Sequence, residues 1–333
     1  MERFEDLTPA GRRRRLFALA KHALSRYELH DPAIGFLAAV TNLHFRVTTR
    51  DGLRLVLRLG HPSWRSLGDL RSEAMWLEAL ARDTDVGAPE VVRTRDGLPV
   101  FELRTAGVPE PRHVTLMTWV PGRILGRHLS ECNIEMMGIL FARLHIHGKA
   151  WVPPAGFTER RFEHWLSRGE PNLLLDEGTL ARLPIPSRET VLRMHSLVEG
   201  AYERIDRADL RVIHCDLWHD NIKLHHGRLH PFDFEDTITG FRSHDIAMAM
   251  LDLLEATGDE RYPVLLAAFR RGYERLLDWP EDPLEPLQTG RILWKLNYIA
   301  RFHGRWFEKA VERHMGVLST FENTGRVVKP PTG

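Results

Sequence analysis

The periodicity of the sequence changes near residue 120, and this change constrains the fold more than any other feature. Before it, short apolar runs predict strands around one helix over residues 69–82. After it, helical spacing recurs over residues 133–147, 188–206, 243–256, 261–278 and 287–313. Only residues 211–235 interrupt the helical pattern as strand and loop. We therefore predict an α+β fold of two lobes, a β-rich lobe over residues 1–118 and a mostly helical lobe over residues 119–333.

Two hairpins are predicted in the first lobe. Residues 45–47 and 53–59 flank Asp51-Gly52, a dipeptide that strongly favours a tight turn between strands. Val91-Val92 and residues 100–103 flank Asp96-Gly97 in the same way. We therefore predict that these last two strands pair with each other.

Composition excludes several classes of function. The chain has 46 Lys and Arg against 45 Asp and Glu, so no net field draws it to nucleic acid. No apolar run approaches the roughly 20 residues that span a bilayer. The two cysteines, Cys132 and Cys215, fit neither a disulfide framework nor a zinc signature. We expect a cytoplasmic protein without a nucleic-acid or membrane partner.

One segment carries the residues that suggest chemistry. After the apolar residues 212–213, the spacing H-x-D-x-x-x-x-N places Asp216 and Asn221 in a loop. A second acidic cluster, Asp233-Phe234-Glu235-Asp236, follows a tight turn at His226-Gly227. This pattern predicts one hairpin that brings Asp216, Asn221 and Asp233 to the same edge.

Phosphoryl transfer needs this set of side chains. A carboxylate must orient the attacking hydroxyl and accept its proton, which is the role we assign to Asp216. Oxygen ligands must hold Mg²⁺ against the phosphates, which is the role we assign to Asn221 and Asp233. The alternative is a solvated acidic turn with a capping Asn, and the second acidic cluster favours phosphotransfer over it. Whether Glu235 or Asp236 joins the metal site stays open.

The sequence resembles the aminoglycoside phosphotransferase-like enzymes, which have the protein-kinase-like fold. Within them it is most similar to the bacterial branch with stress-response kinase A and type II homoserine kinase-like proteins. The resemblance runs from about Asn42 to Leu254 and implies ATP as donor, Mg²⁺ as cofactor and a hydroxyl-bearing acceptor. Besides the catalytic hairpin, it rests on residues 55–58, Glu73, Ala88-Pro89 and residues 119–122, 142–145 and 154–158.

The resemblance also implies a nucleotide site in the first lobe. Arg58 occupies the position of the basic residue that touches the α- and β-phosphates, where kinases commonly have Lys. Glu73, early in the next helix, is its expected partner. The Thr118 carbonyl and the Val120 amide are expected to face adenine, with Met117 behind the base. The alternatives are a surface Arg58 and a Met117 that only packs in the core.

Other residues are expected to support the site or are left open. The family pattern places His214 against the backbone below the second acidic cluster, and Asp245 as the anchor of the catalytic loop. Residues 34–42 lack G-x-G-x-x-G, so the phosphate-covering loop stays unassigned. Four acidic residues are weak candidates for attracting a cationic acceptor: Asp252, Glu255, Asp259 and Glu260. An aromatic stripe at helical spacing favours core packing over a substrate wall: Trp294, Tyr298, Phe302, His303 and Trp306.

The leading function is an ATP-dependent phosphotransferase that acts on a hydroxyl group of a small molecule. The alternatives are a protein Ser/Thr kinase of the stress-response type and a catalytically silent nucleotide-binding protein. The presence of Asp216, Asn221 and Asp233 together favours an enzyme. The sequence leaves open the acceptor and whether the protein is a monomer or a homodimer.

Overall fold

The computed structural model describes residues 3–39, 41–166 and 169–330. The chain forms two compact units. The first comprises residues 1–121 and 152–158, and the second comprises residues 122–151 and 159–333. The sequence places a boundary between residues 118 and 119, close to this division. It contains no signal that residues 152–158 return to the first unit.

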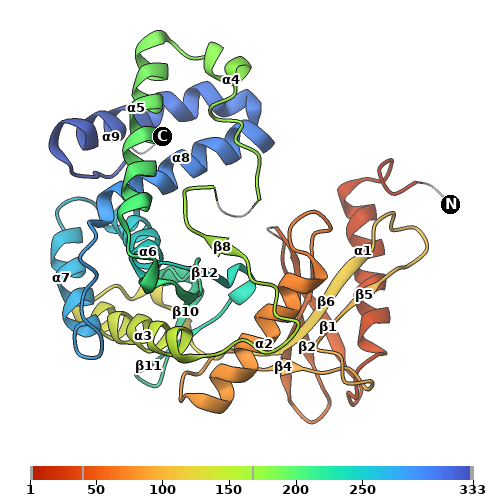
Figure 1. Ribbon diagram of the computed structural model, residues 1–333. Helices are drawn as coiled ribbons and strands as arrows, with labels where there is room; N and C mark the ends of the chain where they lie inside the picture. Colours follow the sequence, from red (N-terminus) through yellow and green to blue (C-terminus); the bar gives the residue numbers. More distant parts are fainter. Residues whose placement is uncertain (1–2, 40, 167–168, 331–333) are drawn as a thin grey trace. The chain divides into compact units, whose positions relative to one another are not determined.

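The first unit is an antiparallel sheet with one helix on each face (Figure 1). The strand order is β1-β2-β3-β6-β4, and β5 also pairs with β6. The helices are α1 (Pro9–Leu24) and α2 (Leu67–Asp83). The strands are β1 (Ala33–Ala39), β2 (Leu43–Thr48), β3 (Arg54–Leu59), β4 (Val91–Val92), β5 (Val100–Leu103) and β6 (Arg112–Thr118).

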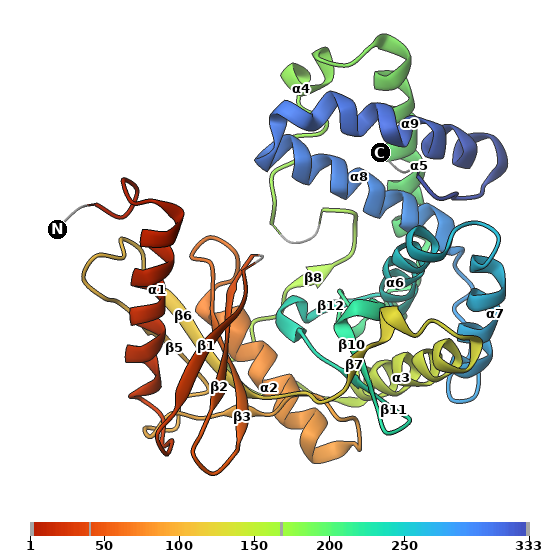
Figure 2. The same ribbon diagram turned by 180° about the vertical axis from the view of Figure 1, so that it is seen from behind.

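The two sheet faces have separate cores. Apolar residues of α1, such as Leu19 and Ala23, pack with Leu55 and Leu57 of β3 in the larger core. A smaller core lies under α2, and Figure 2 shows this helix on the opposite side of the sheet from α1. Because successive side chains of a strand point to opposite faces of the sheet, Leu55 and Leu57 of β3 face α1 and Arg58 faces α2.

One predicted hairpin is confirmed and the other is wrong. β2 and β3 pair in antiparallel register across the turn at Gly52, whose φ of 88° suits glycine. β4 and β5 do not pair with each other. They bind successive stretches of the same edge of β6, at residues 116–117 and 112–115. The turn at Gly97 is present, but it aligns the two strands end to end instead of side by side.

The second unit is mostly helical, and two three-stranded sheets hold its loops. No helix in the described ranges is both long and apolar enough to cross a membrane. The sheet orders are β11-β10-β7 and β8-β12-β9. The strands are β7 (Arg123–Ile124), β8 (Arg161–Phe162), β9 (Arg211–Ile213), β10 (Ile222–His225), β11 (Arg228–Pro231) and β12 (Ile238–Gly240). The helices are α3 (Glu131–Ala150), α4 (Glu177–Ala181), α5 (Ile185–Arg204), α6 (Arg242–Thr257), α7 (Tyr262–Tyr273), α8 (Leu284–Phe302) and α9 (Phe307–Thr324).

Helix α3 packs unusually close to its neighbours because it carries glycine where the backbones meet. A Cβ atom on Gly138 would lie 2.0 Å from the Phe269 carbonyl oxygen of α7. A Cβ atom on Gly148 would lie 1.9 Å from the Val212 carbonyl oxygen of β9. The close approach fixes the strand that leads directly into the H-x-D loop.

The predicted helix over residues 287–313 is wrong, because the chain breaks into α8 and α9. The break is a short 3-10 turn, Gly304–Trp306, preceded by His303 with φ −135° and ψ 35°. Figure 1 shows α8 and α9 running side by side next to α5.

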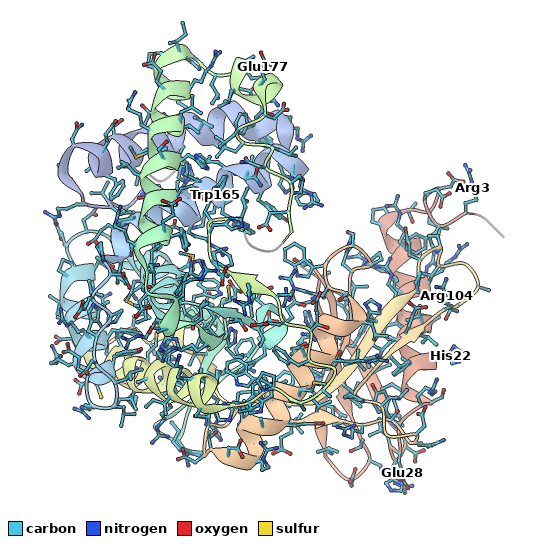
Figure 3. The ribbon with its side chains drawn as sticks, in the orientation of Figure 1. Arg3, His22, Glu28, Arg104, Trp165 and Glu177 are labelled. Carbon is cyan, nitrogen blue, oxygen red and sulfur yellow. The ribbon has the colours of Figure 1, made fainter. Side chains whose placement is uncertain are left out.

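Trp165, labelled in Figure 3, packs edge-on against His195 of α5, with the two ring centroids 5.5 Å apart. The helix predicted over residues 261–278 ends earlier, at Tyr273.

Candidate active site

A buried hydrogen-bond network holds the H-x-D loop from below. Asp245, on α6, accepts a hydrogen bond from the backbone N–H of Cys215 at 2.7 Å. Its other carboxylate oxygen lies 3.1 Å from Nε2 of His145 on α3. The remaining ring nitrogen of His145 lies 2.9 Å from the Tyr273 hydroxyl. Asp245 thus contacts the catalytic loop as the sequence predicts, and α3, α6 and α7 share the support.

The support matters because the loop backbone adopts unusual conformations. Cys215 and Asp233 have φ of 66° and 65°, in the left-handed region that residues other than glycine rarely adopt. Such residues cost about 1–3 kcal/mol and persist where the surroundings determine them strongly. Cys215 directly precedes Asp216, and Asp233 is itself the second candidate carboxylate. The two backbone bends therefore determine the direction in which these carboxylates leave the chain.

His214 joins the two halves of the catalytic hairpin. Its Nε2 lies 3.1 Å from the carbonyl oxygen of Phe232, the residue before Asp233, and the side chain is fully buried. This is the contact that the sequence predicts for a structural His214. Burial lowers the pKa of His214 to about 4, because the charged imidazolium would lose its hydration.

The pKa of His214 predicts a loss of stability on acidification. An unfolded histidine titrates near 6.5, so the unfolded chain binds the proton first and stability falls as the pH drops from about 6.5 to about 4. We expect His214 to contribute a loss of about 2 kcal/mol between pH 7 and pH 5. Urea unfolding of the wild type and of His214→Asn at both pH values measures it. An equal pH dependence in the two proteins would contradict the prediction.

Asp216 and Asn221 contact each other across the loop. The Asn221 amide nitrogen donates to the Asp216 carbonyl oxygen at 2.8 Å and to Oδ2 of its side chain at 3.1 Å. Because the nitrogen is directed towards Asp216, the amide oxygen is the atom that Asn221 can offer to a cation. The side chain of Asp216 is 31% exposed, which leaves it accessible to a substrate.

The hairpin brings Asn221 and Asp233 to the same end of β10 and β11. Ile222 pairs with Pro231, and the backbone N–H of Phe232 donates to the Asn221 carbonyl oxygen at 2.9 Å. Within the described residues, no group of three or more His, Cys, Asp or Glu could hold a metal by itself. An amide oxygen and a carboxylate suit Mg²⁺, which commonly takes one or two protein oxygens and completes its shell with phosphates and water. The donor set therefore fits the predicted ion.

The first unit contains a buried ion pair where the nucleotide site was predicted. Arg58 donates from Nη1 to Oε1 of Glu73 at 3.0 Å and from Nη2 to Oε2. Both residues are 1% exposed, so Arg58 is not a surface residue of the strand. Helix α2 positions Glu73 because a capping box between Ser66 and Asp69 fixes the helix start. The expected pairing is present, and the phosphate-binding role of Arg58 stays a prediction.

The predicted adenine-binding residues lie at the end of β6. Met117 is buried and pairs in register with Val56 and Val91, as the core-packing alternative expects. The Thr118 backbone N–H donates to the Glu90 carbonyl oxygen at 2.9 Å, and its hydroxyl accepts from the Glu90 N–H at 2.8 Å. Val120 is also buried. These contacts fix the strand end, and the nucleotide contacts of all three residues stay predictions.

The aromatic stripe was interpreted wrongly from the sequence. Phe302 and Trp306 are 48% and 52% exposed, and Trp294 and Tyr298 are half-buried. Helix α8 uses a different face for the core, formed by residues such as Ile292 and Leu296. Sequence reasoning also missed Arg291, three residues before Trp294 on the same helix. Its guanidinium lies 3.6 Å from Oδ1 of Asp216, a contact that no local pattern encodes.

A family comparison identifies the class of this protein. The sequence model of the phosphotransferase enzyme family, APH, matches residues 33–281, well over half of the chain. The chain belongs to this family. The predicted family resemblance is thereby confirmed, and the protein is a phosphotransferase. No curated protein sequence matches the chain significantly.

Several solved structures share the fold. A microcompartment-associated aminopropanol kinase has a TM-score of 0.77 and 24% identity, covering 92% of this chain and 98% of that chain. Amicoumacin kinase, in complex with AMP-PNP, Ca²⁺ and its antibiotic, has a TM-score of 0.74 and 17% identity over 95% of each chain. AMP-bound spectinomycin phosphotransferase has a TM-score of 0.62 and 11% identity, covering 93% and 99%. These structures confirm the predicted α+β, protein-kinase-like fold.

Proposed function

We propose that the protein transfers the γ-phosphate of Mg·ATP to a hydroxyl group of a small molecule. The observation that carries the proposal is the catalytic hairpin, in which Asn221 contacts Asp216 and strand pairing brings Asp233 to the same end of the hairpin as Asn221. The first unit supplies Arg58 for the phosphates of the nucleotide. The nucleotide and divalent ion in the amicoumacin kinase complex, and the acceptor named for the aminopropanol kinase, support this chemistry by similarity.

Each residue has one task in the proposed mechanism. Asp216 orients the acceptor hydroxyl and takes its proton as the bond to phosphorus forms. Asn221 holds Oδ2 of Asp216, so the carboxylate keeps one rotamer. Asn221 and Asp233 would hold Mg²⁺, which when bound supplies positive charge against the phosphate oxygens. Arg58, held by Glu73, would present its guanidinium to the α- and β-phosphates, which suits a planar donor.

An acceptor screen tests the proposed function. The purified protein is incubated with Mg·ATP and amino alcohols, hydroxy amino acids, sugars and aminoglycosides, and both ADP and the phosphorylated product are measured. The expected result is product formation with at least one class. A parallel assay with casein as a general Ser/Thr substrate tests the protein-kinase alternative. No product from a protein that binds Mg·ATP tightly would favour the silent alternative.

Asp233→Asn is expected to weaken Mg·ATP binding while the fold is retained. Mutating a residue that only supports a metal ligand typically lowers metal affinity by roughly 10- to 100-fold. Replacing a proposed ligand itself should lower Mg·ATP affinity by at least as much. Calorimetric titration with Mg·ATP measures the effect, and titration with ATP in EDTA is the control. Asp233→Asn should match the wild type in EDTA. Equal Mg·ATP affinity in the two proteins would remove Asp233 from the metal site.

A further inference from the structure

Arg291 is placed beside the catalytic carboxylate but is not used by the proposed mechanism. It lies on α8, and its guanidinium contacts Oδ1 of Asp216 at 3.6 Å. The same guanidinium lies over the ring of Trp294, 4.3 Å from the ring centroid. The indole N–H of Trp294 donates to Glu170 at 2.6 Å, which fixes the ring under the cation. The contacts hold the charge at one position next to Asp216.

The guanidinium keeps donors for a further group. Its distance to Asp216 exceeds that of a charge-assisted hydrogen bond, about 2.7–2.9 Å. The Nε atom of Arg291 is buried, and within the described residues it has no hydrogen-bond acceptor. The side chain is only 15% exposed. A largely buried guanidinium with unsatisfied donors is suited to bind an anion in the bidentate manner typical of Arg.

The two oxygens of Asp216 face different partners. Oδ2 contacts Asn221, the predicted metal ligand, and Oδ1 contacts Arg291. The hydroxyl that Asp216 activates must approach from outside the metal site. The α8 side of the carboxylate is therefore the side that remains for the acceptor.

The two acidic residues of this face that the sequence singled out, Asp252 and Glu255, are already paired with a lysine. Lys295, one turn after Arg291, contacts Asp252 at 3.7 Å and Glu255 at 2.7 Å. Burial raises the pKa of Asp252, because desolvation disfavours the charged carboxylate. The cationic acceptor that Asp252 and Glu255 suggested from the sequence would thus have to displace Lys295. Arg291 instead leaves an unsatisfied positive group within reach of the reacting hydroxyl.

We propose that Arg291 binds a carboxylate of the acceptor, so that the substrate class is small hydroxyl compounds that carry a carboxylate. This inference rests on the proposed phosphotransfer at Asp216. The half-buried aromatic face of α8 supplies the wall for the rest of the acceptor. It consists of Trp294 and Tyr298, whose ring centroids lie 5.6 Å apart.

Two matched compound pairs test the inference. Threonine and 1-amino-2-propanol differ only by the carboxylate, as do homoserine and 3-amino-1-propanol. In the wild type, kcat/KM should be higher for at least one carboxylated compound by about 10- to 100-fold, the usual range for hydrogen bonds to a charged group. Arg291→Met should remove most of this preference by raising KM for that compound. Arg291→Lys should keep part of it, because the charge stays but the planar fork is lost.

Arg301→Met is the matched control. Arg301 lies on the same helix, and its guanidinium stacks over Phe302 at 4.7 Å, away from the catalytic loop. This variant should keep the wild-type preference. A preference that falls equally in both variants would assign the effect to α8 as a whole and overturn the role of Arg291.

The remaining outcomes separate the inference from the proposed function. A higher wild-type kcat/KM for the compounds without a carboxylate would overturn the inference. So would an equal fall of kcat/KM for both compounds of a pair in Arg291→Met. Phosphorylation of sugars or aminoglycosides but of no carboxylated compound would also overturn it, while the proposed function would stand. A wild type that neither binds Mg·ATP in calorimetry nor transfers phosphate would overturn both.

Discussion

Asp216→Asn is expected to lower the rate of phosphoryl transfer by roughly 10²- to 10⁴-fold, the usual contribution of a positioned acid–base group. The substitution keeps the size of the side chain and its contact with Asn221, but it removes the carboxylate that we propose as the proton acceptor. The fold should survive because the loop is held through Cys215 and Asp245, not through the Asp216 carboxylate. Mg·ATP affinity should stay close to that of the wild type.

Binding and chemistry must be measured separately to test this result. Calorimetry reports the affinity for Mg·ATP, and single-turnover kinetics with an acceptor that the wild type phosphorylates report the chemical step. Asp220→Asn makes the same chemical change four residues further along the loop, at a half-exposed side chain, and should leave the rate nearly unchanged. Unchanged single-turnover rates in a folded Asp216→Asn variant would remove Asp216 from the mechanism.

Glu73→Gln is expected to destabilise the protein by about 3–5 kcal/mol, the cost of removing one partner from a buried ion pair. Arg58 and Glu73 are both 1% exposed, so water cannot replace the lost carboxylate around the guanidinium. Urea unfolding measures the change. Glu78→Gln, on the same helix, removes one partner of an exposed pair with Arg93 and should cost at most about 1 kcal/mol.

The double variant Arg58→Met/Glu73→Leu separates stability from nucleotide binding. Apolar replacement of both buried partners is often neutral or stabilising, so the double variant should regain most of the stability lost in Glu73→Gln. It should nevertheless bind Mg·ATP weakly, because the guanidinium that we propose to bind the phosphates is gone. Wild-type nucleotide affinity in a stable double variant would move phosphate binding to another residue.

Features with local signals could be predicted from the sequence. The hairpin at Asp51-Gly52 has a two-residue signal, and the spacing of Asp216, Asn221 and Asp233 lies within one hairpin, so no long-range knowledge was needed. The helix carrying Glu73 follows from its apolar period and begins at Leu67 with a capping box.

Features that depend on long-range packing could not be predicted. The turn signal at Asp96-Gly97 predicts that the chain changes direction, but it does not identify the strand with which the flanking residues pair. Both β4 and β5 pair with the edge of β6, which is distant in the sequence. Helical spacing along α8 shows which residues share a face, but not whether that face is covered. The contact of Arg291 with Asp216 joins residues far apart in the chain, so no motif records it.

The supports of the catalytic loop suggest how such an enzyme could be redesigned. Asp245, His145 and Tyr273 hold the loop from α6, α3 and α7, and none of them lies on α8. Helix α8 has its core side chains on one face and Arg291, Trp294 and Tyr298 on another. A directed-evolution library confined to Trp294 and Tyr298 would vary the proposed acceptor wall and would leave the supports of the loop and the contact of Arg291 with Asp216 unchanged.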